Sequence, residues 1–222
     1  MLDIFMKKWL KRLLLLGLIL FFGYLVYLNH LVKGTFSSEI QFSKKINYIE
    51  YPLEEYPKEM VNMLLLVEDQ SFFQHWGVDF KEVVRVVYGY LFEDKAIRGA
   101  STITQQLIKN TLLSRDRTLS RKIDEALMAM LMELNYDKNY ILARYMNTVY
   151  LAQKGSMAIH GFASASQFYF DKKVGDLDLR EMATLVALLK GPSYYHPVKY
   201  PDRLNKRVDM ILLMHNKYKK II

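Results

Sequence analysis

The feature that most constrains this 222-residue sequence is an uncharged apolar run at residues 13–28, LLLLGLILFFGYLVYL. With its apolar flanks the run is about 20 residues long, enough for a helix to cross the hydrocarbon core of a bilayer. Four basic residues precede it, at positions 7, 8, 11 and 12. Because basic residues favour the cytoplasmic side of a membrane, we expect a cytoplasmic tail at 1–12, a transmembrane helix at 13–32, and the rest of the chain outside.

A cleaved signal peptide is the alternative interpretation of the same run. Cleavage requires small residues just after the apolar segment. Tyr24, Tyr27, Asn29 and His30 occupy that region instead. The sequence therefore favours an uncleaved anchor.

The net charge of +8 suggests an anionic partner. Residues 1–33 hold five basic residues and one acidic residue, so half of that charge belongs to the anchor. This distribution, with the outward orientation, argues against nucleic acid as the partner. The chain has no cysteine, which excludes disulfides, zinc–thiolate sites and a thiol nucleophile.

The remaining sequence divides into a linker, a domain and a tail. Residues 33–56 alternate polar and apolar side chains and predict a linker with one or two short extended pieces. From residue 57 the apolar spacing is mostly helical, which predicts a mainly α domain at 57–215 and a basic tail at 216–222. Predicted helices begin at residue 57 and near residue 101, and span 80–92, 119–135, 139–149, 157–170, 179–189 and 202–215. Asp178 and Glu181 are expected to form a capping box at the start of the 179–189 helix.

The first polar motif is EDQSFFQHWG at residues 68–77. Glu68 and Asp69 fall at the predicted C-terminal end of an apolar helix, where the helix dipole disfavours anions. A carboxylate kept in such a place suits proton transfer. The alternative is a solvated helix end above aromatic core residues.

The second motif is GASTITQQLIKN at residues 99–110. Ser101 or Thr102 can cap a helix on which Thr102, Gln105 or Gln106, and Lys109 share one face. Hydroxyl, amide and ammonium groups suit sugar hydroxyls or a phosphate. The alternative is an ordinary solvated face, although long charged residues are more usual there than paired glutamines.

The third motif is a basic cluster followed by an acid. Its members are Arg115, Arg117, Arg121, Lys122 and Glu125. We expect the apolar stripe of this helix at Leu119, Ile123, Ala126, Leu127, Met130 and Leu134. Glu125 would then lie on the opposite face beside Arg121. The motif is either an exposed ion pair of small energetic value or a carboxylate among cations that suits an anionic leaving group.

In this order the motifs resemble those of the peptidoglycan glycosyltransferase family, the monofunctional transglycosylases and class A penicillin-binding proteins. The family patterns E-D-x-x-F-x-x-H-x-G, G-A-S-T-I-T-Q-Q-x-x-K-N and R-K-x-x-E match residues 68–77, 99–110 and 121–125. A looser fourth motif covers 141–147, where Ala143 replaces the usual glutamate, and a fifth region covers 181–197. The match extends over roughly residues 57–212 and is most similar to the 1b type of class A penicillin-binding protein.

The resemblance implies a mainly α, lysozyme-like glycosyltransferase domain with a membrane-proximal hydrophobic jaw, behind a single N-terminal transmembrane helix. It implies an inverting hexosyltransferase at the outer face of the bacterial cytoplasmic membrane. The enzyme would polymerise lipid II onto a growing lipid-linked glycan strand and release undecaprenyl pyrophosphate. A transpeptidase or other cell-wall synthesis proteins are candidate partners, and nucleic acid is not.

The resemblance also implies roles for single residues. Glu68 would be the general base, and Glu125 would organise the cations or hold a divalent cation, Mg²⁺ or Mn²⁺. No organic cofactor is expected. The predicted substrate-binding residues are Asp69, Phe72, His75, Gly99, Ser101, Thr102, Gln105, Gln106, Lys109, Asn110, Arg117, Arg121 and Lys122.

Two alternatives are weighed against this function. A lytic transglycosylase-like hydrolase shares the fold and an essential glutamate, but it has no need of Lys109, Arg117 and Arg121 because no pyrophosphate leaves. A non-catalytic, membrane-anchored cell-wall scaffold is disfavoured by the presence of both Glu68 and Glu125. Since the sequence ends at residue 222, we expect polymerisation of glycan without cross-linking.

Overall fold

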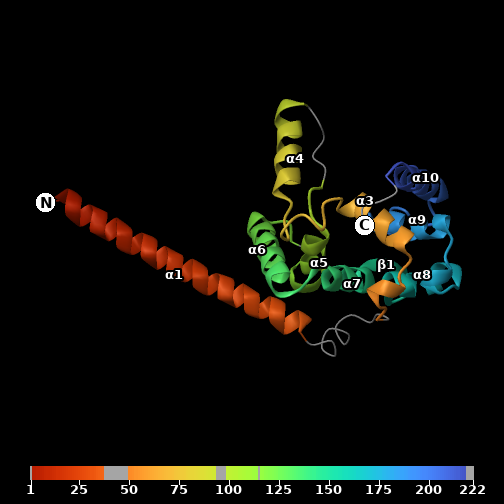
Figure 1. Ribbon diagram of the computed structural model, residues 1–222, viewed down its shortest axis with the longest axis horizontal. Helices are drawn as coiled ribbons and strands as arrows, with labels where there is room; N and C mark the ends of the chain where they lie inside the picture. The colour runs from red at the N-terminus through yellow and green to blue at the C-terminus, as the bar shows by residue number, and fades with distance from the viewer. Residues whose placement is uncertain (1, 38–49, 94–98, 115, 219–222) are drawn as a thin grey trace.

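The computed structural model describes residues 2–37, 50–93, 99–114 and 116–218. The described chain is mainly α, as predicted, with a long N-terminal helix that extends away from a helical body (Figure 1). This helix, α1, spans Leu2–Phe36 and runs past both ends of the predicted 13–32 segment. Lys33 in its last turn complements the negative end of the helix dipole, which helps the helix continue into the predicted linker.

The helix α1 has two parts with different surroundings. Within the described residues, 5–36 form the one helix that is long and apolar enough to cross a membrane. Most of its side chains are exposed, but Leu28, Val32 and Phe36 are buried. They pack where α1 meets α6, Leu119–Asn135, and Asn29 and Asn135 share a hydrogen bond of 2.7 Å there. The end of α1 is therefore part of the core of the body.

Truncating Phe36 should destabilise the body. Its side chain is 2% exposed and its ring meets Tyr136 edge-on at 6.3 Å. We expect Phe36→Ala to lower the free energy of unfolding by about 3–5 kcal/mol, the usual cost of deleting a buried aromatic side chain. Phe22→Ala is the matched control, because Phe22 is 69% exposed on the same helix. Denaturant unfolding in detergent would measure both; an equal effect of the two variants would contradict the docking of α1.

Apart from one β-hairpin, the described body consists of α6 and nine further helical segments. They are η1 Leu53–Glu55, α3 Lys58–Glu68, α4 Phe80–Phe92, α5 Ile103–Leu112, α7 Lys138–Thr148, α8 Phe162–Phe170, η2 Val174–Asp176, α9 Leu179–Leu188 and α10 Pro201–Lys217, in addition to α6. Side-chain caps explain several starts: Thr102, Thr118 and Asp137 each accept a hydrogen bond from a backbone N–H of the following helix. The predicted capping box of Asp178 and Glu181 is confirmed.

The predicted helix over 157–170 is wrong in its first part and confirmed in its second. Strand β1, Tyr150–Lys154, pairs antiparallel with β2, Met157–His160, and only then does α8 begin. Gly155, with φ of +59°, makes the turn of this hairpin. Gly161 has φ of +80°, and a Cβ there would lie 2.3 Å from the Asn147 carbonyl oxygen. The backbone must leave the helical conformation at both glycines, so no single helix can cover the segment.

The buried face of α6 also differs from the prediction. Glu125, Met128, Ala129 and Met132 are buried, whereas members of the predicted apolar stripe are exposed: Leu119 by 78%, Ile123 by 51% and Leu134 by 69%. The backbone of Gly77 packs directly against the backbone of Ala129, which holds this face of α6 toward the body. Apolar periodicity alone pointed to the wrong face.

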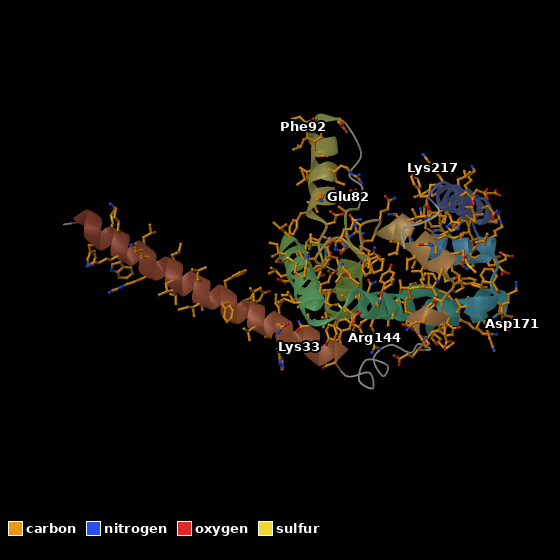
Figure 2. The ribbon with its side chains drawn as sticks, viewed as in Figure 1. Lys33, Glu82, Phe92, Arg144, Asp171 and Lys217 are labelled. Carbon is orange, nitrogen blue, oxygen red and sulfur yellow. The ribbon has the colours of Figure 1, made fainter. Side chains whose placement is uncertain are left out.

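Helix α4 stands apart from the rest of the body (Figure 1). It also carries many exposed apolar side chains. Those exposed by half or more are Phe80, Val84, Val87, Tyr88, Tyr90, Leu91 and Phe92. Phe92 lies at its far end (Figure 2). An exposed apolar surface of this size marks an interaction site with lipid or protein.

Two predicted segments lie partly outside the described residues. The predicted extended pieces of the linker fall mostly on residues 38–49, and the basic tail includes residues 219–222. Of the tail, Asn216 and Lys217 continue α10.

Candidate functional site

Glu68 is the last residue of α3, and its carboxylate is held by a short chain of neutral groups. Gln106 Nε2 donates to Glu68 Oε2 at 3.0 Å, and the Tyr145 hydroxyl donates to Gln106 Oε1 at 3.0 Å. Tyr145 is buried; this burial and the nearby charge of Glu68 raise the pKa of its phenol well above the usual value. The phenol therefore stays a donor. Orientation by neutral groups leaves the Glu68 carboxylate free to accept a proton.

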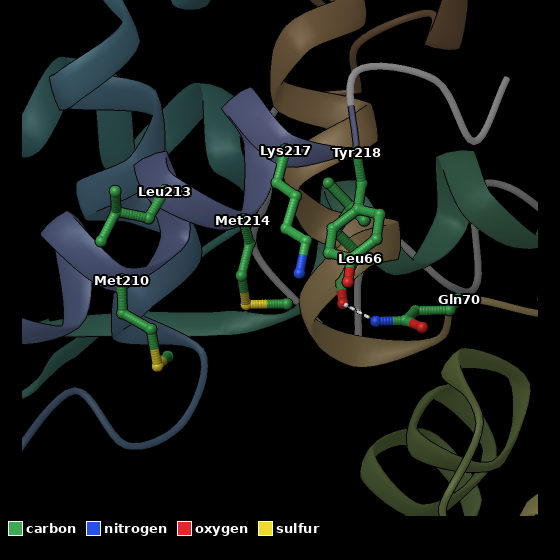
Figure 3. A pocket seen from close by; sticks show the side chains of 7 residues that line it. All are labelled: Leu66, Gln70, Met210, Leu213, Met214, Lys217 and Tyr218. Atoms are coloured by element: carbon green, nitrogen blue, oxygen red, sulfur yellow. Dashed lines mark hydrogen bonds between the residues drawn. The ribbon is translucent and has the colours of Figure 1, made fainter.

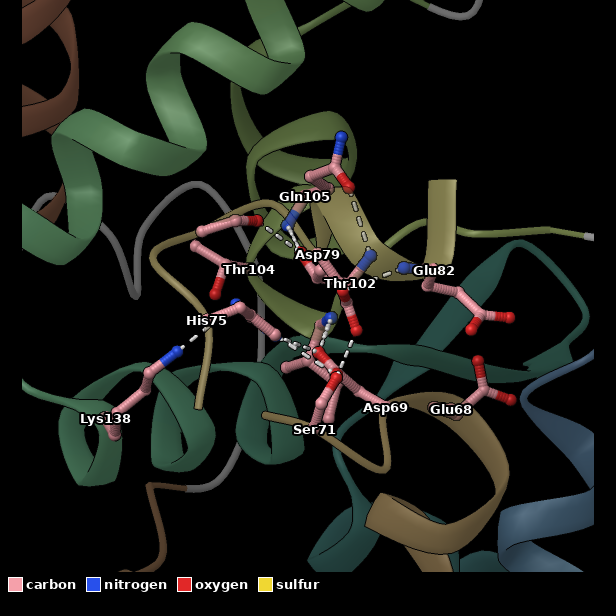
Figure 4. Close-up of polar contacts among 12 residues, drawn as sticks. Glu68, Asp69, Ser71, His75, Asp79, Glu82, Thr102, Thr104, Gln105 and Lys138 are labelled. Carbon is pink, nitrogen blue, oxygen red and sulfur yellow. Dashed lines mark hydrogen bonds and ion pairs between the residues drawn. The ribbon is translucent and has the colours of Figure 1, made fainter. Parts of the chain in front are cut away.

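Asp69 follows Glu68 directly but its side chain turns to a different cluster (Figure 4). It is buried, His75 Nε2 lies 3.0 Å from Oδ2, and the backbone N–H of Ile103 donates to Oδ2 at 2.9 Å. The two adjacent carboxylates therefore have different surroundings. Asp69 and His75, both predicted to bind substrate, make their contacts here with protein groups.

The second motif places its first polar residues in a helix cap. Thr102 Oγ1 accepts from the Gln105 N–H, and Gln105 Oε1 accepts from the Thr102 N–H, both at 3.1 Å. Thr102 Oγ1 also donates to the Gly77 carbonyl at 2.6 Å. Thr102 and Gln105 are thus buried and join α5 to the first motif, while Gln106 alone of the two glutamines contacts Glu68.

Glu125 lies between two cations. Its side chain is 1% exposed, Arg121 donates to Oε2 at 2.8 Å, and Lys122 donates to Oε1. Lys122 Nζ also donates to Ser101 Oγ at 2.7 Å, which joins the third motif to the second. Arg121 Nε is buried without a hydrogen-bond partner among the described residues. A buried donor in this state is costly.

The other predicted residues lie around these clusters. Phe72 is buried, with Lys138 Nζ 4.5 Å from its ring centre. Lys109 is exposed one turn beyond Gln106 on α5. Also exposed are Gly99, Asn110 and Arg117. Arg115 lies outside the described residues.

Removing the charge of Glu125 should affect both stability and catalysis. In Glu125→Gln, two cations lose their buried partner, so we expect the free energy of unfolding to fall by about 3 kcal/mol. We expect the catalytic rate to fall by about 100-fold, since Arg121 and Lys122 lose their orientation. Asp209→Asn is the matched control, because Asp209 pairs with Arg180 at 2.8 Å but is 58% exposed; it should cost less than about 1 kcal/mol. Comparable losses in both variants would refute an organising role.

No three histidine, aspartate or glutamate side chains gather to hold a metal ion within the part of the chain that the structure describes. Both Glu125 oxygens already accept from cationic side chains. In this structure both carboxylate oxygens of Glu125 are therefore taken up by ion pairs.

A groove of about 640 Å³ lies beside the end of α3 (Figure 3). Its lining is Leu66, Gln70, Met210, Leu213, Met214, Lys217 and Tyr218. None of these is a predicted site residue, and the lining has no carboxylate for acid–base chemistry. The polar clusters around Glu68 and Glu125 are therefore the better candidate site.

Three polar residues at the site were missed by the sequence analysis: Tyr145 and Glu133, whose side chains are buried, and Lys138, whose side chain is partly buried. Lys138 Nζ lies 2.7 Å from both Glu133 oxygens. The periodicity of α6 held a signal, because Glu133 follows Glu125 by eight residues and so lies near the same face. Placing Glu125 on the exposed face hid it.

Comparison with known proteins identifies the family of the chain. The sequence pattern of the family described as Transglycosylase matches residues 33–215. The chain belongs to the transglycosylase family, and its mainly α body agrees with the lysozyme-like fold expected of that family.

Relatives include three proteins named penicillin-binding protein 1B. The protein from Haemophilus influenzae is 41% identical over 170 residues, 77% of this chain and 22% of the relative. That from Vibrio cholerae is 44% identical over 159 residues, 72% of this chain and 20% of the relative. That from Escherichia coli is 41% identical over 161 residues, 72% of this chain and 19% of the relative. The chain thus spans about a fifth of these relatives.

Proposed function

We propose that the protein is a membrane-anchored peptidoglycan glycosyltransferase that polymerises lipid II. The observation that carries the proposal is the pairing of one oriented carboxylate, Glu68, with a separate cluster of cations around the buried Glu125. Polymerisation needs both parts. A hydroxyl must lose its proton to become a nucleophile, and a pyrophosphate must leave.

Glu68 is the general base of this proposal. It takes the proton of the acceptor 4-hydroxyl while that oxygen forms a bond with the anomeric carbon of the donor. The bond from that carbon to the pyrophosphate oxygen breaks, and attack from the opposite face inverts the configuration. The Tyr145–Gln106 chain supports this role because it orients Glu68 without adding a charge to it.

Arg121 and Lys122 would stabilise the charge that develops on the leaving pyrophosphate, together with the exposed Lys109 and Arg117. Preorganised cations contribute most where they need no reorganisation during the reaction. Glu125 provides that order by pairing with both side chains. A hydrolase that releases no pyrophosphate has no such need, which favours the transferase over the lytic alternative.

A divalent cation, Mg²⁺ or Mn²⁺, would in this proposal bind chiefly to the pyrophosphate of the substrate. Such ions commonly combine one or two carboxylates with substrate phosphates. Both Glu125 oxygens already accept hydrogen bonds from Arg121 and Lys122, which supports a minor contribution of the protein to the ligands of this ion.

The apolar helix α1 would anchor the enzyme in the bacterial cytoplasmic membrane with its N-terminus in the cytoplasm. The exposed face of α4 would enter the outer leaflet and serve as the membrane-proximal hydrophobic jaw. Both substrates carry lipid tails, so anchoring confines enzyme and substrates to one thin layer. Transpeptidases are candidate partners of the glycan product.

One assay with three outcomes tests the proposal. Full-length protein in detergent receives either lipid II with Mg²⁺ or preformed glycan strands, and the products are separated by size. We expect glycan polymer from lipid II and unchanged preformed strands. Shorter fragments from the preformed strands would favour the lytic hydrolase, and no product from either substrate would favour the scaffold.

A further inference from the structure

Behind Glu68 lies a set of four ionisable side chains from three parts of the chain. Asp69 and His75 belong to the segment after α3, Glu133 lies near the end of α6, and Lys138 begins α7. The side chains of Asp69, His75 and Glu133 are at most 5% exposed. Charges in such surroundings are costly unless they are paired, so each of these side chains needs a partner within the set.

The contacts of Lys138 define one end of this set. Its ammonium lies 2.7 Å from Glu133 Oε1 and Oε2, and Glu133 Oε1 also accepts from Thr104 Oγ1 at 2.7 Å. Burial lowers the pKa of Lys138, an effect that Glu133 opposes. With one carboxylate in direct contact, Lys138 carries its proton and acts only as a donor.

The donor at Lys138 determines which nitrogen of His75 carries a proton. Lys138 Nζ lies 3.5 Å from His75 Nδ1, and Glu133 Oε1 is farther away at 3.8 Å. Nδ1 therefore accepts, and the ring proton lies on Nε2. Nε2 in turn faces both Asp69 oxygens, at 3.0 and 3.1 Å, and donates to them.

Asp69 connects this set to the proposed base in two ways. It follows Glu68 in the chain, and its Oδ2 accepts from the N–H of Ile103, the first residue of α5. Gln106, which holds Glu68, lies three residues further along α5. A shift of Asp69 would therefore move both partners of the Glu68–Gln106 contact.

We propose that Glu133 and Lys138 are positioning residues for glycan polymerisation, acting through His75 and Asp69 on the Glu68–Gln106 contact. This inference rests on the proposed function. Neither residue touches the reacting atoms; together they fix the tautomer and orientation of His75, and so the place of Asp69.

Lys138→Met tests the inference with two readouts. In kinetics with lipid II, we expect kcat to fall by about 10–100-fold while KM changes by less than about threefold, because the variant disturbs the base and not the substrate-binding cations. In ¹⁵N NMR of labelled histidine, Nδ1 of His75 loses the contact with Lys138 Nζ, so we expect the chemical shift of this nitrogen to change. The NMR readout needs no substrate.

Matched variants separate positioning from general destabilisation. Lys172→Met removes an ammonium 2.7 Å from Glu181 on another part of the body, and it should leave kcat and the His75 signals unchanged. Glu133→Gln keeps an acceptor for Thr104 and is the second variant should Lys138→Met not fold; it too should lower kcat more than it raises KM.

The outcomes distinguish this inference from the function on which it rests. If the wild type is active and a folded Lys138→Met or Glu133→Gln variant has a normal kcat, the positioning role alone is overturned. An unchanged His75 spectrum in Lys138→Met would also overturn it. Wild-type protein that makes no polymer would overturn the proposed function, and this inference with it.

Discussion

The Glu68→Gln variant should lose polymerisation by about 1,000-fold or more, within the range expected for removal of a general base. The amide has nearly the same shape as the carboxylate, and its oxygen can still accept the hydrogen bond from Gln106 Nε2. Only the capacity to take up a proton is lost. We therefore expect kcat to carry the loss, about 4 kcal/mol of transition-state stabilisation, with KM and the melting temperature little changed.

The comparison needs a control on the same helix. Glu59 is exposed in the first turn of α3, so Glu59→Gln removes the same charge away from the site and should retain full activity. Initial rates of polymer formation from lipid II would measure both variants. Equal rates for Glu68→Gln and the wild type would remove Glu68 from the mechanism.

The Gly77→Ala variant should strongly destabilise the body. Gly77 has φ of +79°, and a Cβ there would lie 2.5 Å from the carbonyl carbon and oxygen of Ala129. These are backbone atoms of α6 and cannot move without the helix. We expect the free energy of unfolding to fall by about 4 kcal/mol, from backbone strain plus overpacking.

Activity should fall with stability in Gly77→Ala, because the Gly77 carbonyl accepts the hydrogen bond of Thr102, the cap of α5. Gly155→Ala separates strain from steric clash, since Gly155 has φ of +59° but nothing within 4 Å of the added Cβ. That control should cost only about 1 kcal/mol. Thermal unfolding would report the difference, and equal melting temperatures would show that α6 does not confine Gly77.

Local signals in the sequence predicted most of the helices. Strong apolar periodicity and capping residues gave the bounds of α4 and α6 and the cap at Asp178. The hairpin before α8 was missed because its conformation depends on Gly155 and on the contact of Gly161 with the Asn147 backbone. That contact is between residues 14 positions apart and leaves no periodic pattern.

The sequence analysis identified the motifs of the candidate site but not the contacts that their side chains make. The sequence analysis placed Glu68 and Asp69 in one motif, as base and substrate-binding residue, and their side chains have different partners. Apolar periodicity placed Glu125 on an exposed face, whereas two cations make its burial possible. Which polar groups become buried depends on tertiary partners, and single-sequence patterns do not contain them.

The stoichiometry of lipid release tests the central claim most directly. Wild-type protein with lipid II should release one undecaprenyl pyrophosphate for each glycosidic bond formed, because the proposed step breaks one anomeric bond to pyrophosphate as it makes one bond to the acceptor oxygen. Glycan bonds and the released lipid would be quantified in the same samples over time. A one-to-one ratio is the predicted result; fragments of preformed glycan without release of pyrophosphate would contradict it.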